Sequence, residues 1–574
     1  MKRFIIFALL MASLVINVYG QNSSASPPAG TNGAPDMELL PVLKGVVILD
    51  SVDAVNPNGV AEPGIHFKGP KFLTSNDVAV VMTPFIGQRL TTNSLHTLEK
   101  QLILLCRKHD HPVVDVIAPE QDFTSGVLQI AILEGKVGNV TVARKGGKWY
   151  SDAYIRRNIR VKQGDPIIES QLLEDINWLN QNSYFRDVNV AFSQGALGGE
   201  TDIHLEETDR FPVRVSAGYD DEGPKIIGED RVFAGLLWGN AFGLDQRFNY
   251  QYTTDTSFEF LKAHTAGYDI PLPWRNTLTF FGSYADVRAK YLPPPLIEEG
   301  SSYQASMRYA IPLPKLGHYT HEVSLGYDFK HSDNNLEFGG STATLAATPT
   351  DVDQFFGGYR ALLPDSWGES DLAIQSYYSP GNLTSENTRA RFSVANPGPA
   401  TPWTGTASEY YYLHFNADRS ITNLPAGFKL LFRVQAQLTD CKLLPSEQMG
   451  FGGMDTVRGY DERFVNGDRG VVVNSELHTP QLSLGGDLFG SSTPDTLEGL
   501  IFADYGSAYV IDPDAGPDHF TLASVGVGAR YRISRHLDLQ VDYGFQLVRN
   551  EFLINQVPVD SSSSRGHIAL VVSY

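Results

Sequence analysis

The sequence is poor in cysteine, with 2 among 574 residues. If the chain is exported, these two could pair in an oxidising compartment. However, Cys106 lies in a segment with a helical pattern, and Cys441 lies far downstream in a different segment. We therefore expect no structural disulfide.

Long apolar runs are also missing. After Gly20, no continuous apolar stretch is long enough to cross a bilayer as a helix, yet 11% of the residues are aromatic and can bury a core. A transmembrane β-barrel would account for both facts. Its strands turn only every second residue toward lipid, so its mean hydropathy, here -0.17, can resemble that of a soluble protein. Composition alone would equally allow a secreted all-β protein.

Positive charge is scarce relative to negative charge, and the formal net charge is -20 at pH 7. Nucleic acids and anionic membrane surfaces recruit basic protein surface, so neither is an expected partner. The sequence also lacks the G-x-x-x-x-G-K-S/T loop of nucleotide sites, the G-x-S-x-G elbow and the H-E-x-x-H motif. We therefore expect no nucleotide, no cofactor and no catalytic residues.

Two polar clusters could suggest metal ions. Cys106, His109 and His111 crowd the end of a helical segment, but three candidate ligands without a second pair at zinc spacing favour a polar helix terminus. The acidic cluster between Asp461 and Asp468 lacks the spacing and the closing glutamate of a calcium loop. We expect no metal at either place.

The N-terminus indicates the compartment. Lys2 and Arg3 precede an apolar run from Phe4 to Val18, and Gly20 supplies a small residue before a polar, Pro/Gly-rich stretch. This layout is typical of a secretory signal peptide, whereas the alternative, a spanning helix, would need a longer run. We expect residues 1–20 to be a signal peptide and residues 21–39 to be a flexible linker, so that the mature chain leaves the cytoplasm.

Residues 40–209 mix helical and strand patterns. Each half contains four apolar residues at helical spacing, followed by two strand-like runs; these are Leu95, Leu98, Leu102 and Leu105, and then Leu172, Leu173, Ile176 and Leu179. The order β-α-α-β-β can be read twice. The pattern predicts two small α+β modules, at residues 40–136 and 137–209.

From residue 210 to residue 574 the helical period is replaced by alternation. In Leu537–Leu547, apolar residues alternate with polar or small ones, a pattern that a soluble sandwich would also show. The connections discriminate better, because tight turns such as Ala241–Leu244 alternate with long polar links such as Asn334–Thr350. Short turns on one rim and long loops on the other indicate an outer-membrane barrel, with about sixteen strands and both termini on the short-turn side.

The last strand carries a further signal. Ile568, Leu570, Val572 and the terminal Tyr574 share one face. A chain that ends on an aromatic residue in phase with an apolar strand looks like the assembly signal of outer-membrane barrels. The alternative is that these residues are simply the outer face of the last strand.

Two short motifs lie within the barrel pattern. Val457-Arg458-Gly459-Tyr460 falls in the long link at residues 441–468, between the strands counted as eleventh and twelfth. On the next upward strand, Phe502, Asp504 and Gly506 form the pattern F-x-D-x-G. In this context the pair of motifs resembles the two-partner secretion transporters, the exporters of haemolysin and filamentous-haemagglutinin type within the outer-membrane assembly-factor superfamily.

The resemblance extends from about Leu40 to Tyr574, nearly the whole mature chain. It implies that the two modules are polypeptide-transport-associated (POTRA) domains in the periplasm, followed by a 16-stranded antiparallel transmembrane barrel in the outer membrane of a Gram-negative bacterium. It also implies that the 441–468 link enters the lumen. One feature departs from the family, because Gln21–Leu40 contains no amphipathic stretch that matches its frequent N-terminal plug helix. Either the plug is absent, or the loop alone occupies the lumen.

The two motifs suggest a contact. Asp504 and the other two motif residues of its strand share a face, and exposure of that carboxylate to lipid would be prohibitive, so we expect this face to line the lumen. If the loop folds inward, Arg458 can bind Asp504 through two charge-assisted hydrogen bonds. Gly459 would permit close approach to the wall, and Tyr460 would pack beside the pair. The alternative is a solvated loop arginine and one pore-lining acid among several.

Three functions remain open. The resemblance implies a transporter that recognises a large, β-rich secreted exoprotein, with outer-membrane lipid around it and the barrel-assembly machinery as its partner during biogenesis. An exposed strand edge of a POTRA module could accept an extended segment of that client, although the sequence does not say which edge. The second function is a barrel assembly and insertion factor, a class that usually carries more modules. The third, a passive porin or enzyme barrel, needs neither modules nor a latch.

Overall fold

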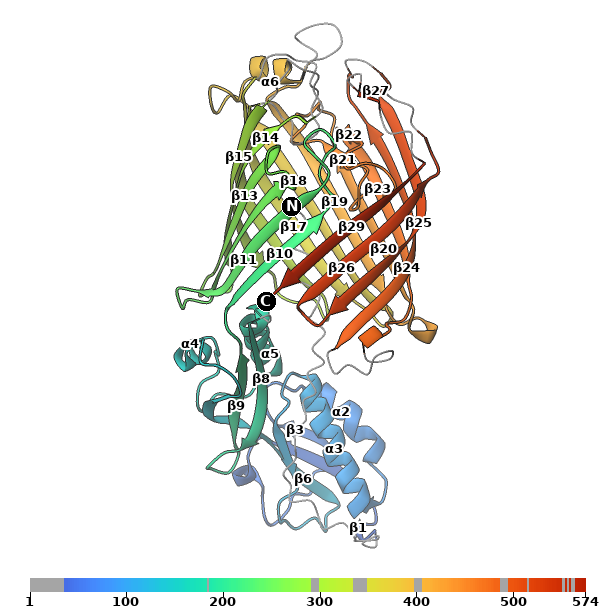
Figure 1. Cartoon of the computed structure of the whole chain (residues 1–574). Coiled ribbons are helices and arrows are strands. Elements are labelled where there is room, and N and C mark those ends of the chain that lie inside the picture. Colours follow the sequence, from blue (N-terminus) through green and yellow to red (C-terminus); the bar gives the residue numbers. More distant parts are fainter. Residues whose placement is uncertain are drawn as a thin grey trace. The chain divides into compact units, whose positions relative to one another are not determined.

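The computed structural model describes residues 36–574 apart from 183–184, 291–298, 334–347, 397–404, 486–493, 514–515, 550–552, 555–556 and 559–562. The chain divides into two compact units, residues 1–211 and 212–574. The first unit contains two α+β modules, and the second is a closed β-barrel (Figure 1). The expected signal peptide, residues 1–20, and most of the expected linker, residues 21–39, lie outside the described residues.

The first module is a mixed four-stranded sheet with two helices. Its sheet order is β3-β2-β6-β5. Its elements in chain order are β2 (Gly45–Leu49), β3 (Gly64–Lys68), α2 (Ser75–Met82), α3 (Thr92–Lys108), β5 (Val114–Ile117) and β6 (Val127–Glu134), with a separate short pair of β1 (Glu38–Leu40) and β4 (Leu90–Thr91). Strand β3 was not predicted. It is short and nowhere fully buried, and it is held by parallel pairing with β2, which no local pattern reveals.

Helix α3 supplies much of the core of the first module. Thr91 caps its start, because the Thr91 hydroxyl accepts a hydrogen bond from the Ser94 backbone while the Ser94 side chain bonds back. Leu98, Leu102 and Cys106 are fully buried on one face, as the spacing predicted for the two leucines. Burial raises the pKa of the Cys106 thiol to about 12, so this thiol is inert packing, and both cysteines of the chain are free.

The second module has the expected β-α-α-β-β order. Its elements are β7 (Lys136–Arg144), α4 (Asp152–Arg157), α5 (Glu169–Leu179), β8 (Arg186–Gln194) and β9 (Glu200–Asp209). Strand β9 is central, parallel to β7 and antiparallel to β8. From α5, Leu172, Ile176 and Leu179 are buried in the core, again as the helical spacing predicted.

Asp110 connects the two modules. It follows α3 with a left-handed φ of 71°, and its carbonyl accepts a hydrogen bond from Glu169 N at 3.0 Å. Its carboxylate accepts one from Ser170 N at 2.7 Å. Because Ile168, the residue at the start of α5, provides no side-chain cap, the first module caps this helix of the second.

Sixteen antiparallel strands form the barrel, which closes where β10 pairs with β29. This count confirms the expected number. The strands are β10 (Val213–Asp220), β11 (Arg231–Ala241), β12 (Gln246–Asp255), β13 (Leu261–Pro271), β14 (Thr277–Arg288), β15 (Glu299–Pro312), β16 (Thr320–Ser332), β17 (Thr350–Pro364), β18 (Gly368–Pro380), β19 (Glu409–Ile421), β20 (Lys429–Leu438), β23 (Arg469–His478), β24 (Asp495–Tyr509), β25 (His519–Ile533), β26 (Leu537–Gln546) and β29 (Ser564–Ser573).

The outer face of the barrel is apolar. On β29, Ile568 and Val572 point outward, while His567 on the opposite face is buried, and the terminal Tyr574 is 90% exposed. Exposed aromatic rings gather at the tight turns and near the opposite strand ends, which is the layout of rings at two membrane interfaces. They include Phe242, Trp274, Tyr319 and Trp367 at the turns and Tyr303, Tyr378, Tyr411 and Tyr509 at the other ends. Within the described part of the chain, no helix is long and apolar enough to cross a membrane.

One acid in the second module is buried without a hydrogen bond. Glu207 on β9 is 1% exposed, and neither carboxylate oxygen has a hydrogen-bond partner among the described residues. Arg144 Nε lies 3.7 Å from Glu207 Oε2, too far for a hydrogen bond. Burial raises the pKa of Glu207 to about 7, because the loss of hydration outweighs the attraction of Arg144.

This raised pKa predicts that the stability of the second module depends on pH. The folded value lies above the ordinary value of 4.5, so the contribution of Glu207 to stability is full below 4.5 and is lost as the pH rises through about 7. Between about pH 6 and about pH 8, we expect the opening equilibrium of β8 and β9 to increase about tenfold. Glu207→Gln should remove most of this change. Hydrogen exchange of the full chain, corrected for the intrinsic rate, measures it.

The matched control is Glu206→Gln, which changes the neighbouring exposed acid that pairs with Lys145. This control should keep the pH dependence of the wild type. An equal pH dependence in the wild type and in Glu207→Gln would contradict the assignment.

Candidate lumen site

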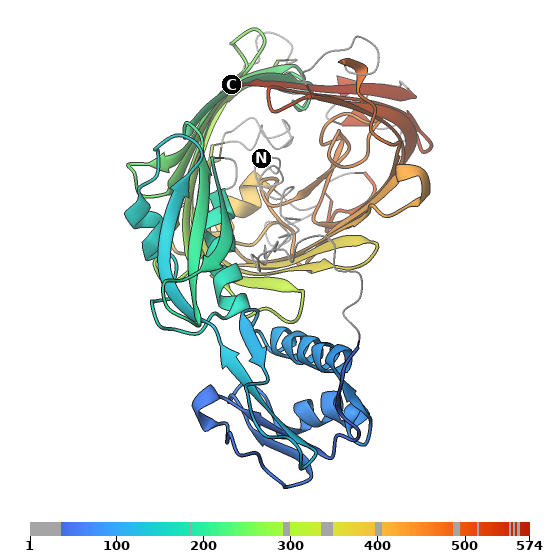
Figure 2. The same ribbon diagram turned by 90° about the horizontal axis from the view of Figure 1, so that it is seen from below.

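The link between β20 and β23, residues 439–468, folds into the barrel. It contains a short hairpin in which β21 (Met449–Phe451) pairs with β22 (Val465–Gly467). Figure 2 shows this orange segment inside the ring of strands. The link packs on the inner wall through an apolar cluster of Phe451, Val457, Tyr460 and Val465 with Val472, Ala508 and Leu522.

Arg458 reaches three carboxylates of the wall. Its Nε and Nη2 each donate to Asp504 on β24 at 2.8 Å, and its backbone N–H donates to the same carboxylate at 3.1 Å. Nη1 donates to Glu476 on β23 at 2.6 Å and, at 3.4 Å, to Asp542 on β26. Asn474 donates to Asp504 at 2.8 Å and so orients it. The Arg458 side chain is 3% exposed, so one buried cation joins the loop to three strands.

The other two residues of the F-x-D-x-G motif make room for the loop and cover it. The Phe502 ring centre lies 3.6 Å from the Arg458 guanidinium carbon, within the range of a cation–π contact. A Cβ atom at Gly526 would lie 2.4 Å from that ring, so this glycine provides the space for it. A Cβ atom at Gly506 would lie 2.8 Å from Val457 Cγ2. The absence of a side chain at Gly506 therefore allows Val457 to pack against the wall.

Gly459 brings the loop backbone against β26. It has a left-handed φ of 89°, and a Cβ atom on Gly544 would lie 2.6 Å from Gly459 N. Gly459 N–H donates to His567 Nε2 at 3.2 Å, and Gln546 donates to the Gly459 carbonyl at 2.6 Å. The Tyr460 hydroxyl donates to the Val548 carbonyl and accepts a hydrogen bond from the Ala523 backbone N–H on β25. The tip is thus held by backbone contacts as well as by charge.

All seven motif residues meet at one place in the structure, namely Val457, Arg458, Gly459, Tyr460, Phe502, Asp504 and Gly506. Six partners were not predicted, namely Asn474, Glu476, Asp542, Gly544, Gln546 and His567. Their only sequence signal is a place on the polar face of an alternating strand, which many other residues share. The C-terminal group Ile568, Leu570, Val572 and Tyr574 lies outside this site, with its exposed members on the outer face.

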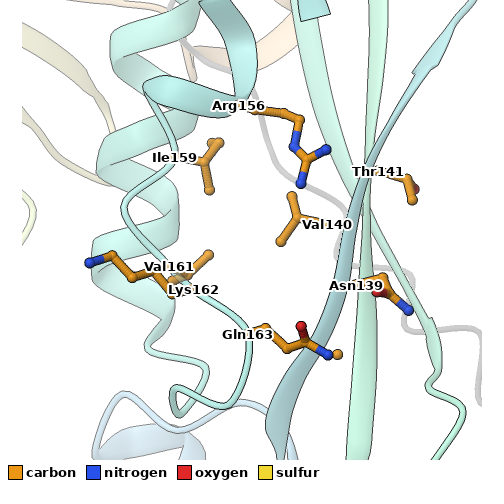
Figure 3. A pocket seen from close by; sticks show the side chains of 9 residues that line it. Asn139, Val140, Thr141, Arg156, Ile159, Val161, Lys162 and Gln163 are labelled. Atoms are coloured by element: carbon orange, nitrogen blue, oxygen red, sulfur yellow. The ribbon is translucent and has the colours of Figure 1, made fainter. Parts of the chain in front are cut away.

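A second feature is a groove of about 460 Å³ in the second module (Figure 3). It runs along the outer edge of β7, which is an end strand of its sheet. On that side the start of β7 is bonded to a loop, through Val137 with Gly164 and Asp165, and no other strand of the described residues pairs with the rest of the edge. Val140, Ile159 and Val161 line it with apolar surface. Arg156 and Lys162 also line it, and neither forms an ion pair with a described residue. The groove therefore combines an open strand edge, an apolar lining and two cations.

Two family models match the chain. One is described as haemolysin secretion/activation protein ShlB/FhaC/HecB and matches residues 199–347 and 376–531, which is more than half of the chain. The other is the POTRA domain of ShlB type, which matches residues 63–135 in the first module.

The curated relatives are transporters. The chain is 23% identical over 374 residues to the outer membrane transporter CdiB of Dickeya dadantii (strain 3937), covering 62% of this chain and 61% of that protein. It is 21% identical over 430 residues to the heme/hemopexin transporter protein HuxB of Haemophilus influenzae, covering 71% and 69%. The match thus spans less than two thirds of the CdiB relative.

Solved structures share the fold. CdiB from Escherichia coli aligns with a TM-score of 0.70 at 17% identity, covering 95% of this chain and 92% of that one. BamA from Haemophilus ducreyi lacking POTRA domains 1-3 aligns with a TM-score of 0.50 at 14% identity, covering 88% and 98%.

The fit between Gly506 and Val457 predicts that the loop can be displaced without altering any charge. In Gly506→Val the new side chain occupies the place of Val457, so we expect amide exchange of residues 455–462 to increase about tenfold. Hydrogen-exchange mass spectrometry of the purified full chain measures this. The control is Gly357→Val on β17, where a Cβ atom would meet nothing closer than Ser376 Oγ at 4.0 Å. Equal exchange protection of residues 455–462 in Gly506→Val and Gly357→Val would show that the loop tip does not depend on the fit between Gly506 and Val457.

Proposed function

Because the chain belongs to the haemolysin secretion/activation family, we propose that it exports a secreted partner protein through its barrel to the cell surface, as in two-partner (type V) secretion. The observation that carries this proposal is the buried Arg458 cluster, which holds a folded loop inside a closed barrel. A simple diffusion pore needs no such loop and no POTRA modules.

The protein is located in the outer membrane of a Gram-negative bacterium, with its POTRA region in the periplasm. The apolar outer face and the two sets of exposed aromatic rings fit a surrounding lipid layer. We assign POTRA domains to residues 40–136 and 137–209, the barrel to residues 210–574 and the export signal to residues 1–20. The outward apolar face at Ile568, Leu570 and Val572, with Tyr574, is the proposed signal to the barrel-assembly machinery.

The client is a large, β-rich exoprotein in this proposal. The sequence contains no nucleotide-binding loop, so transport would draw on folding of the client outside the cell. The Arg458 contact with Asp504 acts as the latch of the lumen loop, which blocks the pore until the client arrives. These roles rest on the geometry of the cluster and on the family of the chain.

The second candidate is a barrel assembly and insertion factor. The BamA structure supports this only at the level of the fold, with 14% identity. The curated relatives are transporters, and the family model matches the barrel over two long segments. The transporter is therefore the better-supported function.

Deletion of the gene in its native host tests the two candidates. Quantitative mass spectrometry of the medium and of the outer membrane should show the loss of one large exoprotein while other barrels persist. A general decrease in outer-membrane barrels would instead identify an assembly factor, and no change in either fraction would favour a passive pore.

Complementation of the deletion strain separates assembly from transport. Arg458→Ala should yield a folded barrel that fails to restore the exoprotein, because the latch has lost its cation. The control is Arg360→Ala, which removes an arginine that pairs with Asp371 on the neighbouring strand and not with the loop. Normal export by Arg458→Ala would reject the latch.

We further propose that the β7 groove receives an extended segment of the client. An added strand would form main-chain hydrogen bonds with the β7 edge, which require no particular client sequence. Its inward side chains would contact Val140, Ile159 and Val161. Arg156 and Lys162 would favour a segment that carries carboxylates.

Photo-crosslinking in living cells tests this groove. A photoreactive side chain at Thr141, on the exposed side of β7, should capture the exoprotein that disappears in the deletion strain. Arg156→Glu with Lys162→Glu should weaken capture about tenfold, whereas Arg157→Glu, beside Tyr154 and outside the groove, should not. Capture only from Asn189, on the opposite edge strand β8, would move the docking site there.

A further inference from the structure

The lumen link has a second attachment to the wall, away from the motif residues. Glu447 has a side chain that is 0% exposed, and Lys330 Nζ on β16 donates to both of its oxygens, at 2.8 and 3.0 Å. The Tyr412 hydroxyl on β19 donates to the same carboxylate at 2.8 Å. Both oxygens of a buried acid are therefore bound by the wall.

The two attachments use different strands of the barrel wall. In the sheet order, Glu447 is bound from β16 and β19, whereas Arg458 is bound from β23, β24 and β26, which follow β20 in the ring. The link therefore joins two separate stretches of the wall, β16–β19 and β23–β26. In Figure 2 the orange segment lies in the interior of the ring.

Apolar packing supports the second attachment. Leu443 and Leu444 of the link are fully buried against Phe392 of α6 (Arg389–Ala395), together with side chains of β17 and β19. Asn396, which follows α6, donates to the Leu443 carbonyl at 2.7 Å. Helix α6 and Asn396 therefore cover the base of the link. This packing involves none of the residues that hold Arg458.

We propose that Glu447 and Lys330 form a second attachment, which keeps the base of the link on the β16–β19 wall when the tip at Arg458 is released. The proposal rests on the proposed function, in which this link is the gate of the pore. A link that is fixed at one wall can swing but cannot leave the lumen. Because the two attachments share no residue, we expect their effects to add. Glu447 is thus a positioning residue of the gate.

Purified full-length protein in detergent and in planar bilayers tests the second attachment. Glu447→Gln should increase the exchange of residues 442–450 about tenfold and leave residues 455–462 protected, whereas Arg458→Ala should do the reverse. Neither Glu447→Gln nor Arg458→Ala alone should give a sustained open conductance in planar bilayers. The variant that combines both substitutions should give one. Arg360→Ala, in the wall but away from the link, should behave as the wild type.

A double variant distinguishes a pair from two separate effects. Lys330→Met removes the lysine and leaves the charge of Glu447 buried without that partner. Adding Glu447→Gln removes this charge. The double variant should therefore show less amide exchange at residues 442–450 than Lys330→Met alone. Lys330→Arg should retain wild-type protection. A heat-dependent mobility shift on a gel verifies that each barrel has folded.

Two results would overturn the proposal. One is wild-type exchange at residues 442–450 in both Glu447→Gln and Lys330→Met. The other is exposure of residues 442–450 together with residues 455–462 in Arg458→Ala, which would show that the link moves as one unit. Neither measurement needs a client, so failure of the second attachment is distinct from failure of the export assignment.

Discussion

The position of the loop tip in the lumen depends on one buried cation, Arg458. A guanidinium that leaves water must be matched by carboxylates and its other donors must be bonded, or the folded state is strongly destabilised. Asp504, Glu476 and Asp542 meet this demand at Arg458, each from a different strand. Their positions require the loop to enter deeply, which explains why glycines face each other where the loop meets β26. The pairing of Arg458 with these carboxylates therefore dictates how closely the backbone of the loop must approach that of β26.

Closure of the barrel makes such a polar interior compatible with a membrane. Each of the sixteen strands has two hydrogen-bonded neighbours, so the main chain is satisfied within the sheet. The period of two then directs apolar side chains outward and polar ones inward on the same strand. On β24, buried Phe502 and Asp504 alternate with exposed Ile501 and Tyr505. The same alternation thus places apolar side chains toward the lipid and polar side chains toward the lumen.

Local periodicity was enough to predict most of the fold. Alternation and turns indicated sixteen strands, and helical spacing identified the buried faces of α3 and α5, because these signals reside in neighbouring residues. Strand β3 was missed because its position depends on pairing with β2 and not on its own pattern. The pairing of Arg458 with Asp504 was expected only through a family resemblance. Glu476, Asp542, Lys330 and Glu447 were not singled out, because strand register and the path of the loop decide which lumen charges meet.

In the proposed function the lumen link is the gate of the pore, and the burial of these charges limits how such a gate can open. Salt screens exposed ion pairs well but buried pairs poorly, so ionic strength alone is a weak means of release. A ligand shifts such an equilibrium only by as much as it prefers the open state to the closed one. A client that merely docks on a POTRA strand edge, and binds both states equally, would leave the gate closed. Opening therefore requires interactions that exist only when the link has moved, either with the freed wall carboxylates or with the lumen surface that the link covers.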